Sequence, residues 1–259
     1  VRPDSDAIID GDRRFTYRAF DQAVDEIAAG LTACGVEPGD RVALLLSNCA
    51  EFAFVFFGAM RAGAVAVPLN TREQKPELEF TLGNCGAKVI DHDAELEDRL
   101  PDAASVPTLK HKFAVGSAAE DSQPLSALFK SGVAPTVIAA QESPAVILYT
   151  SGTTGKPKGA VLTQMSMVMS AMHYETCWGL TADDRALMAV PATHVTGLVA
   201  IMLAMVRAKG ATIILGAFKA AAFLDLAAKE RMTYTLMVPA MYHLCLLQTD
   251  ISGYDLSAW

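Results

Sequence analysis

The chain has 259 residues, of which 52% are hydrophobic, and its formal net charge is −8 at pH 7. A chain of this length and composition can bury one large core or two smaller ones. The negative charge argues against a nucleic-acid-binding surface, which normally needs a basic face. The longest apolar stretch, residues 195–206, is interrupted by Thr196 and Gly197. It is shorter than the roughly 20 residues that a membrane span requires.

The cysteines are odd in number and widely spaced, which favours buried free thiols in a reducing cytosol over disulfides. No group of cysteines and histidines has the spacing of a zinc site. The polar N-terminal residues lack the apolar centre of a signal peptide, so we expect a cytoplasmic location. The cysteines are Cys34, Cys49, Cys85, Cys177 and Cys245.

The first 90 residues alternate between helical and strand patterns. Apolar residues recur at offsets of four, three and four from Phe20 to Leu31, which predicts a helix that begins at Thr16 and ends at Gly35. The continuous apolar run at 42–46 is typical of a strand covered on both faces. Beyond it we predict a helix at 50–61, a strand at 64–67, a helix at 76–82 and a strand at 87–90.

Residues 92–135 are weakly patterned, and we expect an irregular connection with one short strand near Phe113. The alternation resumes afterwards, and alternating strands and helices imply βαβ units around a parallel sheet. The fold class is therefore α/β, with a suggested division into residues 1–140 and 141–259. We predict helices at 164–177, 197–208, 220–231 and from 239, and strands at 186–190, 212–215 and 233–238.

The most informative segment is residues 149–159, YTSGTTGKPKG, which lies between two apolar runs. Gly152 and Gly155 permit backbone angles that are closed to other residues. The loop can therefore turn its N–H groups inward and form an anion-binding concavity. Four aliphatic hydroxyls and two lysines in the segment add donors and positive charge. This chemistry suits a polyphosphate ligand.

The Walker phosphate loop, G-x-x-x-x-G-K-[ST], does not fit this segment. Gly152 and Gly155 are separated by two residues instead of four, and Lys156 is followed by Pro157 where a magnesium-binding hydroxyl would stand. The next residues are short and apolar, which predicts a strand instead of a phosphate-capping helix. We therefore expect a loop that joins two strands, and a P-loop kinase or NTPase is disfavoured.

Residues 149–159 resemble the phosphate-loop signature of the adenylate-forming superfamily, which includes acyl-CoA synthetases, aryl-CoA ligases, luciferases and the adenylation domains of peptide synthetases. The resemblance extends over essentially the whole chain and implies the family's layered αβαβα large domain. Among these enzymes the chain is most similar to acyl-CoA synthetases and fatty-acid–CoA ligases. Four further segments match in the same order: FTYRAF at 15–20, GDRVAL at 39–44, GAMRAGAVAVPLN at 58–70 and PATHVTG at 191–197.

The resemblance assigns the β- and γ-phosphates of ATP to this loop, with Lys158 supplying positive charge. Thr150 resembles a position that helps to hold Mg²⁺. Lys156 is favoured as an exposed, solvated lysine, because the family motif accepts many residues there. The expected ATP-contacting residues are Thr150, Ser151, Gly152, Thr153, Thr154 and Gly155.

His194 follows a predicted strand end and precedes a helix start. Ligands gather beyond the carboxyl ends of strands in open α/β sheets. The resemblance makes His194 a catalytic residue or gate beside the substrate carboxylate, with Thr196 and Gly197 next to it, while a capping histidine is the alternative. Ala200 either lines the acyl pocket or packs in the core. Surface or helical positions are expected for His92, His111 and His243.

The resemblance implies an ATP-dependent acid–CoA ligase that activates a fatty or aromatic acid as acyl-AMP and transfers it to CoA. ATP, Mg²⁺, CoA and the acid would be its ligands, and a homodimer is among the assemblies that it allows. The family's Mg²⁺-binding glutamate, ribose-binding aspartate and lid lysine belong to segments that would follow Trp259. The chain therefore corresponds to the N-terminal part of the large domain, and we expect it to be inactive alone. The alternative is a non-catalytic module that binds a nucleotide or a partner.

Overall fold

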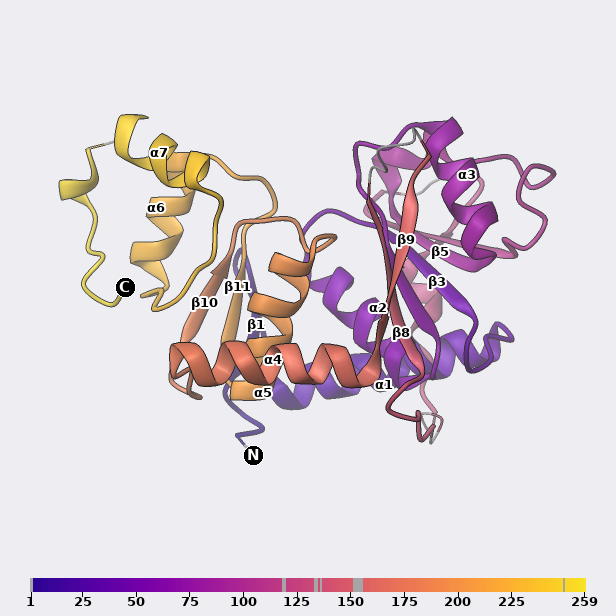
Figure 1. Ribbon diagram of the computed structural model, residues 1–259, viewed down its shortest axis with the longest axis horizontal. Coiled ribbons are helices and arrows are strands. Elements are labelled where there is room, and N and C mark those ends of the chain that lie inside the picture. The colour runs from indigo at the N-terminus through magenta and orange to yellow at the C-terminus, as the bar shows by residue number, and fades with distance from the viewer. Residues whose placement is uncertain (1, 118–119, 133–134, 136, 151–155, 249) are drawn as a thin grey trace. The chain divides into compact units, whose positions relative to one another are not determined.

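The computed structural model describes residues 2–117, 120–132, 135, 137–150, 156–248 and 250–259 (Figure 1). Its contacts group the chain into two compact units, each discontinuous in sequence. The suggested division near residue 140 stays a prediction. The terminal unit consists of Val1–Phe20, Asn48–Ala50 and Val168–Trp259, and the central unit consists of Asp21–Ser47 and Glu51–Met167.

The described part of the central unit contains a seven-stranded sheet in the order β7-β6-β5-β3-β4-β8-β9. Adjacent strands are parallel except for β8 and β9, which are antiparallel. The predicted parallel α/β arrangement is confirmed. The strands are β3 (Arg41–Leu45), β4 (Val65–Pro68), β5 (Ala87–Asp93), β6 (His111–Val115), β7 (Gln123–Pro124), β8 (Pro144–Thr150) and β9 (Lys158–Thr163).

The helices of this half of the sequence match the predicted ones closely. Helix α1 (Tyr17–Ala33) begins where the Thr16 hydroxyl accepts the N–H of Ala19 at 3.2 Å. Gly35 follows the helix with φ = 78°, a left-handed conformation that suits glycine. The other helices are α2 (Ala50–Arg61), α3 (Lys75–Cys85) and the two 3₁₀ segments η1 (Ala94–Arg99) and η2 (Leu125–Leu128).

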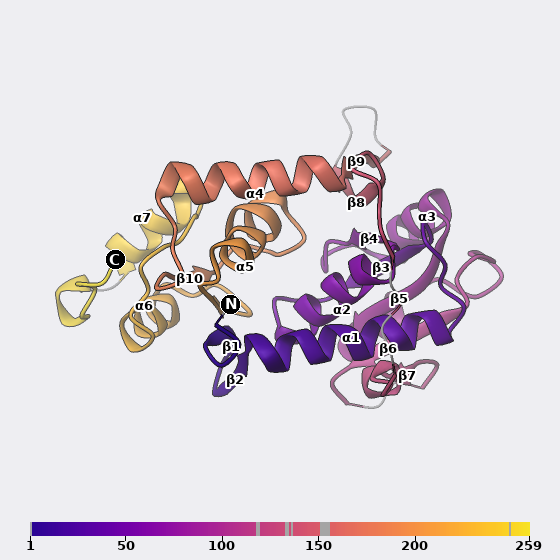
Figure 2. The ribbon, with the colours of Figure 1, turned by 90° about the horizontal axis from the view of Figure 1, so that it is seen from below.

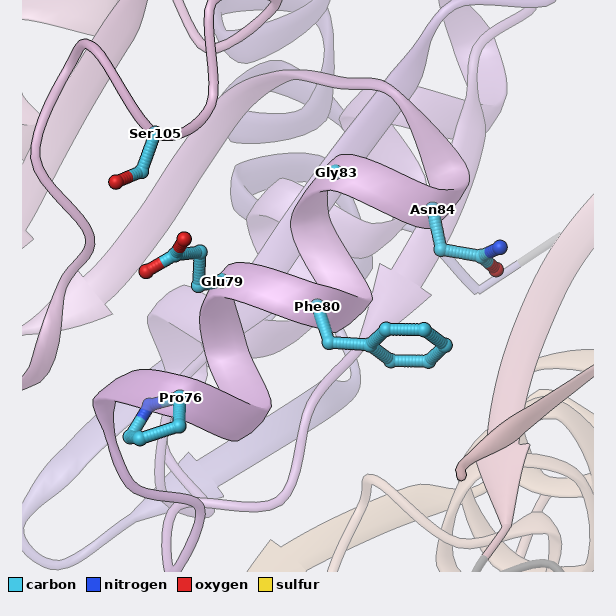
Figure 3. Close-up of a pocket in the computed structure, with 6 residues that line it drawn as sticks. All are labelled: Pro76, Glu79, Phe80, Gly83, Asn84 and Ser105. Atoms are coloured by element: carbon cyan, nitrogen blue, oxygen red, sulfur yellow. The ribbon is translucent and has the colours of Figure 1, made fainter. Parts of the chain in front are cut away.

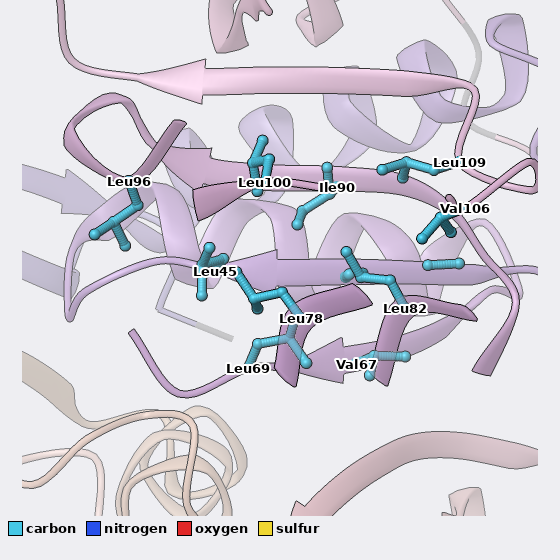
Figure 4. Packing of buried hydrophobic residues seen from close by; sticks show 12 residues of the cluster. Leu45, Val67, Leu69, Leu78, Leu82, Ile90, Leu96, Leu100, Val106 and Leu109 are labelled. Carbon is cyan, nitrogen blue, oxygen red and sulfur yellow. The ribbon is translucent and has the colours of Figure 1, made fainter. Parts of the chain in front are cut away.

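One buried cluster in the central unit fixes α3 against the sheet (Figure 4). Leu78 and Leu82, four residues apart on α3, are both fully buried. They pack in this cluster with Leu45 of β3 and Ile90 of β5. Each side chain of this kind contributes about 1.5–3 kcal/mol when it is fully buried. The opposite side of α3 therefore faces outward in a defined orientation, which matters for the site below.

The described part of the terminal unit contains a four-stranded sheet in the order β10-β11-β1-β2. The first three strands are parallel and β2 is antiparallel to β1. Helices α6 and α7 lie side by side near the C-terminus (Figures 1 and 2). The strands are β1 (Asp6–Asp10), β2 (Arg13–Thr16), β10 (Arg185–Met188) and β11 (Ala211–Ile214), and the helical segments are α4 (Gln164–Trp178), η3 (Thr196–Leu203), α5 (Ala204–Ala208), α6 (Ala220–Lys229), α7 (Pro239–Gln248) and η4 (Ile251–Gly253).

Two predictions about local structure are wrong. The strand expected at 233–238 is reduced to an isolated bridge between Ala186 and Tyr234. His92, expected at the surface or in a helix, is fully buried in β5. Its Nε2 lies 2.8 Å from the Ser122 hydroxyl and its Nδ1 lies 2.9 Å from the Asp93 carbonyl oxygen. The strand can continue beyond its apolar run because these partners form hydrogen bonds with both ring nitrogens of the buried imidazole. Burial lowers the pKa of His92.

The expectation that the cysteines are buried free thiols holds only in part. All five cysteines are free, as predicted. Their predicted burial holds only for Cys245, since Cys177 is exposed and the other three are half-buried. Among the described residues, no helix combines the length and apolar character that a bilayer crossing needs.

Candidate functional site

The antiparallel pair β8–β9 presents the two ends of the predicted phosphate loop. Thr150 is the last residue of β8 and Lys158 is the first of β9, and they lie opposite each other in the strand register. Both are exposed. The expected loop between two strands is therefore confirmed at its flanks. Ser151, Gly152, Thr153, Thr154 and Gly155 lie outside the described residues, and their roles stay predictions.

The close approach of two side chains explains why position 159 is a glycine. It lies opposite Tyr149 in the register. A Cβ atom at this position would stand 2.8 Å from Cγ2 of Ile147 and 3.2 Å from Cζ of Tyr149. The tyrosine ring therefore occupies the space beside Gly159. The Tyr149 hydroxyl donates to Oδ1 of Asn84 on α3 at 2.6 Å, and burial raises the pKa of Tyr149 to about 12.

Helix α3 also contacts the chain on the other side of the loop. The ammonium group of Lys156 lies over the ring of Phe80, 5.7 Å from its centroid. At an exposed position such a contact contributes about 0.5–1 kcal/mol. Phe80 and Asn84 are one turn apart and project from the same side of α3 (Figure 3). Lys156 is exposed, as predicted, and α3 holds both flanks of the loop.

The sequence patterns did not predict this role of Phe80 and Asn84. A signal was present, because Leu78 and Leu82 place the buried face of α3, and a phenylalanine two residues after Leu78 must point away from it. The same two side chains border a pocket of about 520 Å³ (Figure 3). Its lining consists of Pro76, Glu79, Phe80, Gly83, Asn84 and Ser105.

His194 lies in a tight turn after β10, in the terminal unit. Its backbone N–H donates to the Pro191 carbonyl oxygen at 3.1 Å, and its own carbonyl accepts the N–H of Leu198 at 2.9 Å. The His194 residue is exposed, and Thr196 is half-buried. The predicted placement of His194 between a strand end and a helix start is confirmed. Its catalytic role stays a prediction.

The helix that follows begins with a π-helical segment, η3, before it continues as α5. Gly197 in its first turn is buried, and a Cβ atom there would lie 2.5 Å from the Pro191 carbonyl oxygen. Only glycine permits this approach of the helix to the turn. Segments of π-helix are rare and are often found at functional sites.

Ala200 is completely buried in η3. Its carbonyl oxygen accepts a hydrogen bond from the Tyr234 hydroxyl at 3.2 Å. Burial raises the pKa of Tyr234 to about 12. The described contacts therefore fix the backbone at Ala200, and its role as a lining residue of the acyl pocket stays a prediction.

Comparison with known proteins agrees with this arrangement. The family model described as "AMP-binding enzyme" matches residues 1–258. The chain is 32% identical over 258 residues to the feruloyl-CoA synthase of an Amycolatopsis species, covering 100% of this chain and 50% of that protein. It is 34% identical over 236 residues to the long-chain-fatty-acid–CoA ligase FadD13 of Mycobacterium tuberculosis, covering 89% of this chain and 45% of that protein.

A solved structure shows the same fold. The inhibitor-bound N-terminal domain of FACL13 from Mycobacterium tuberculosis has a TM-score of 0.88 at 30% identity, and the match covers 100% of this chain and 65% of that one. The chain belongs to the AMP-binding enzyme family, and its mixed α/β fold matches the N-terminal domains of adenylate-forming enzymes. It spans about half the length of the curated relatives it matches.

Proposed function

We propose that the protein containing this chain is an AMP-forming acid–CoA ligase. It activates a fatty or aromatic carboxylic acid as acyl-AMP, with release of pyrophosphate, and then transfers the acyl group to CoA. The observation that carries the proposal is the β8–β9 hairpin, which places Thr150 opposite Lys158 at the ends of a glycine- and hydroxyl-rich loop. Relatives that act on a feruloyl group and on long-chain fatty acids support the class of acid.

The hairpin residues have the chemistry that a triphosphate needs. Hydroxyl and backbone N–H donors of residues 150–155 bind the β- and γ-phosphate oxygens, and the Lys158 ammonium offsets the negative charge that leaves with pyrophosphate. Mg²⁺ binds proteins through few ligands when substrate phosphates supply the others. A single hydroxyl, that of Thr150, fits this pattern. When bound, the ion shields the triphosphate so that a carboxylate can approach the α-phosphorus.

The His194 turn suits the second substrate. An exposed imidazole at the carboxyl end of β10 can donate a hydrogen bond to the acid carboxylate. Thr196 and Gly197 border it, and Ala200 lies one turn further along η3 toward the tail of the acid. Val195 beside His194 is 51% exposed. An apolar side chain in that place favours a fatty or aromatic acid over a short polar one.

The test is Thr153→Ala combined with Thr154→Ala in the intact protein. Each hydroxyl bond to a charged phosphate oxygen contributes on the order of 1.5–3 kcal/mol. We expect acid-dependent ATP–pyrophosphate exchange to fall by roughly tenfold to a hundredfold for each lost hydroxyl. Affinity for the acid should stay within about twofold, because neither hydroxyl is proposed to touch it.

Thr108→Ala is the matched control, because this threonine is exposed and is assigned no role. Exchange that is unchanged in the double variant would show that the loop does not bind the triphosphate. ATP binding without exchange, with every acid offered to the wild type, would instead support a non-catalytic nucleotide-binding module. A cytoplasmic location and a homodimer remain predictions of the family resemblance.

A further inference from the structure

One side-chain amide in the terminal unit bonds to the segments that follow two neighbouring strands. Asn48 is half-buried and stands just before α2. Its Nδ2 donates to the Val190 carbonyl at 2.9 Å and to the Leu215 carbonyl at 3.2 Å. Its Oδ1 accepts the backbone N–H of Ala192 at 2.8 Å. Val190 follows β10 and Leu215 follows β11, so one amide group ties the carboxyl ends of both strands.

The two bonds around Pro191 define the path of the backbone there. Proline has no N–H, so the chain at this point has one donor fewer for its own hydrogen bonds. Asn48 binds the carbonyl before Pro191 and the N–H after it. The next bond in the chain runs from the His194 N–H to the Pro191 carbonyl. The position of His194 therefore depends on where Asn48 holds Pro191.

The contact at Gly197 transmits the same constraint to the helix. The Pro191 carbonyl oxygen lies against Gly197 so closely that no Cβ atom fits between them. The carbonyl of His194 accepts the first helical bond, from Leu198. A shift of Pro191 would therefore displace both the histidine and the first turn of η3, because tightly packed groups move together.

We propose that Asn48 is a positioning residue that sets the place of His194. The inference rests on the proposed function, because it assigns to Asn48 an effect on acid binding that passes through His194. The requirement is specific to an amide. Asparagine supplies two donors and an acceptor in one planar group, whereas aspartate would set a carboxylate against the carbonyl oxygens of Val190 and Leu215.

The experiment compares Asn48→Asp, Asn48→Ala and Asn48→Gln in the intact protein. The control is Asn70→Ala, because the Asn70 side chain caps a surface turn in the central unit through the N–H of Arg72 at 3.0 Å. The first measurement is hydrogen–deuterium exchange of the peptide covering residues 190–198. We expect exchange about tenfold faster in Asn48→Asp and Asn48→Ala, with partial recovery in Asn48→Gln and no change in the control.

The second measurement is steady-state kinetics of acid-dependent pyrophosphate release. If Asn48 positions His194, kcat/KM for the acid falls by about tenfold or more while KM for ATP stays within about twofold. A general loss of folding would change both substrates together. Asn48→Gln separates these cases as well, since a longer amide that still bonds should recover part of kcat/KM for the acid.

If hydrogen–deuterium exchange of residues 190–198 is equally fast in wild type and Asn48→Asp, the inference is overturned, because the amide would then not hold the turn. Faster exchange with an unchanged kinetic profile would also overturn the role of Asn48 in acid binding. That result would in addition contradict the role proposed for His194. The assignment of the triphosphate to the β8–β9 hairpin would still stand, because the Thr153 and Thr154 double variant tests it independently.

Discussion

The two regions that carry the predicted site residues are anchored in different ways. The flanks of the phosphate loop are held on α3 by one contact of Tyr149 and one of Lys156. The turn that carries His194 is held by an amide with three bonds and by the close approach at Gly197. A single hydrogen bond contributes about 0.5–1.5 kcal/mol, whereas overpacking a core costs about 1–3 kcal/mol or more. We therefore expect the hairpin residues that contact α3 to tolerate substitution better than the turn.

The two units also differ in how they bury carboxyl groups. In the terminal unit, the side chain of Glu230 is 2% exposed, and it accepts hydrogen bonds from Arg14 at 2.7 Å and Arg185 at 2.6 Å. In the central unit, Asp91 is fully buried, and neither of its carboxylate oxygens has a hydrogen-bond partner among the described residues. Burial holds the pKa of Asp91 well above its usual range. The buried Asp91 carboxyl therefore gives the central unit a source of pH-dependent stability.

The largest expected effect is that of Gly197→Ala. The added Cβ would lie 2.5 Å from the Pro191 carbonyl oxygen, which is backbone and cannot turn aside. We expect a loss of about 2–3 kcal/mol in the free energy of unfolding, measured by urea denaturation. Gly83→Ala in α3 is the control from the other region, because nothing lies within 4 Å of its Cβ position. That variant should gain about 0.5–1 kcal/mol from the reduced freedom of the unfolded chain. If both variants changed the free energy of unfolding equally, the turn that carries His194 would be no less tolerant of substitution than α3.

The next largest effect is the pH dependence of Asp91→Asn. The unfolded carboxyl ionises near pH 3.9, and the folded one ionises at a higher pH because burial raises its pKa. In the window between these two pKa values the unfolded state releases a proton that the folded state keeps. The contribution of this carboxyl to wild-type stability therefore falls by about 1.4 kcal/mol per pH unit as the pH rises through that window. Below it, both states are protonated and the loss is absent.

Asp91→Asn removes this ionisation, so its stability relative to wild type should increase as the pH rises. Urea denaturation at several pH values between about 4 and 8 measures the difference. The Asp91 carboxyl interacts with Cys34: burial and, more weakly, Asp91 raise the pKa of Cys34, while Lys130 lowers it. Asp102→Asn is the control, since that carboxylate is 76% exposed. A difference that does not vary with pH would show that Asp91 is not buried in its neutral form.

The smallest effect is that of Tyr149→Phe, which removes the hydroxyl bonded to Asn84. We expect a loss of about 1 kcal/mol in stability. A double-mutant cycle with Asn84→Ala isolates the pair. The coupling energy should be close to the loss in the single variant, and acid-dependent pyrophosphate exchange should fall by less than about tenfold, because Lys156 still contacts Phe80. A coupling energy near zero would show that the hydrogen bond between Tyr149 and Asn84 does not hold this flank of the loop on α3.

The sequence predicted most helices and strands, but it did not predict β1 and β2, it misplaced His92, and one predicted strand is reduced to a single bridge. Thr16 and Gly35 delimit α1 because capping and left-handed backbone are local properties. His92 was misplaced because its burial depends on Ser122, which is 30 residues away and was read as part of an irregular connection. The predicted strand at 233–238 is reduced to one bridge although β10 runs beside it, since the Leu187 carbonyl of β10 accepts the Thr235 hydroxyl.

The site shows the same division. The phosphate-loop motif, the exclusion of the Walker pattern and the place of His194 after a strand were determined by the sequence, since glycine spacing and strand ends are local features. The roles of Asn48, Phe80 and Asn84 were decided only by the tertiary structure. No periodic pattern in the sequence indicates a hydrogen bond between residues 48 and 192 or between residues 84 and 149. Such contacts depend on how strands and helices that are distant in sequence pack together, and only the folded chain brings them within bonding distance.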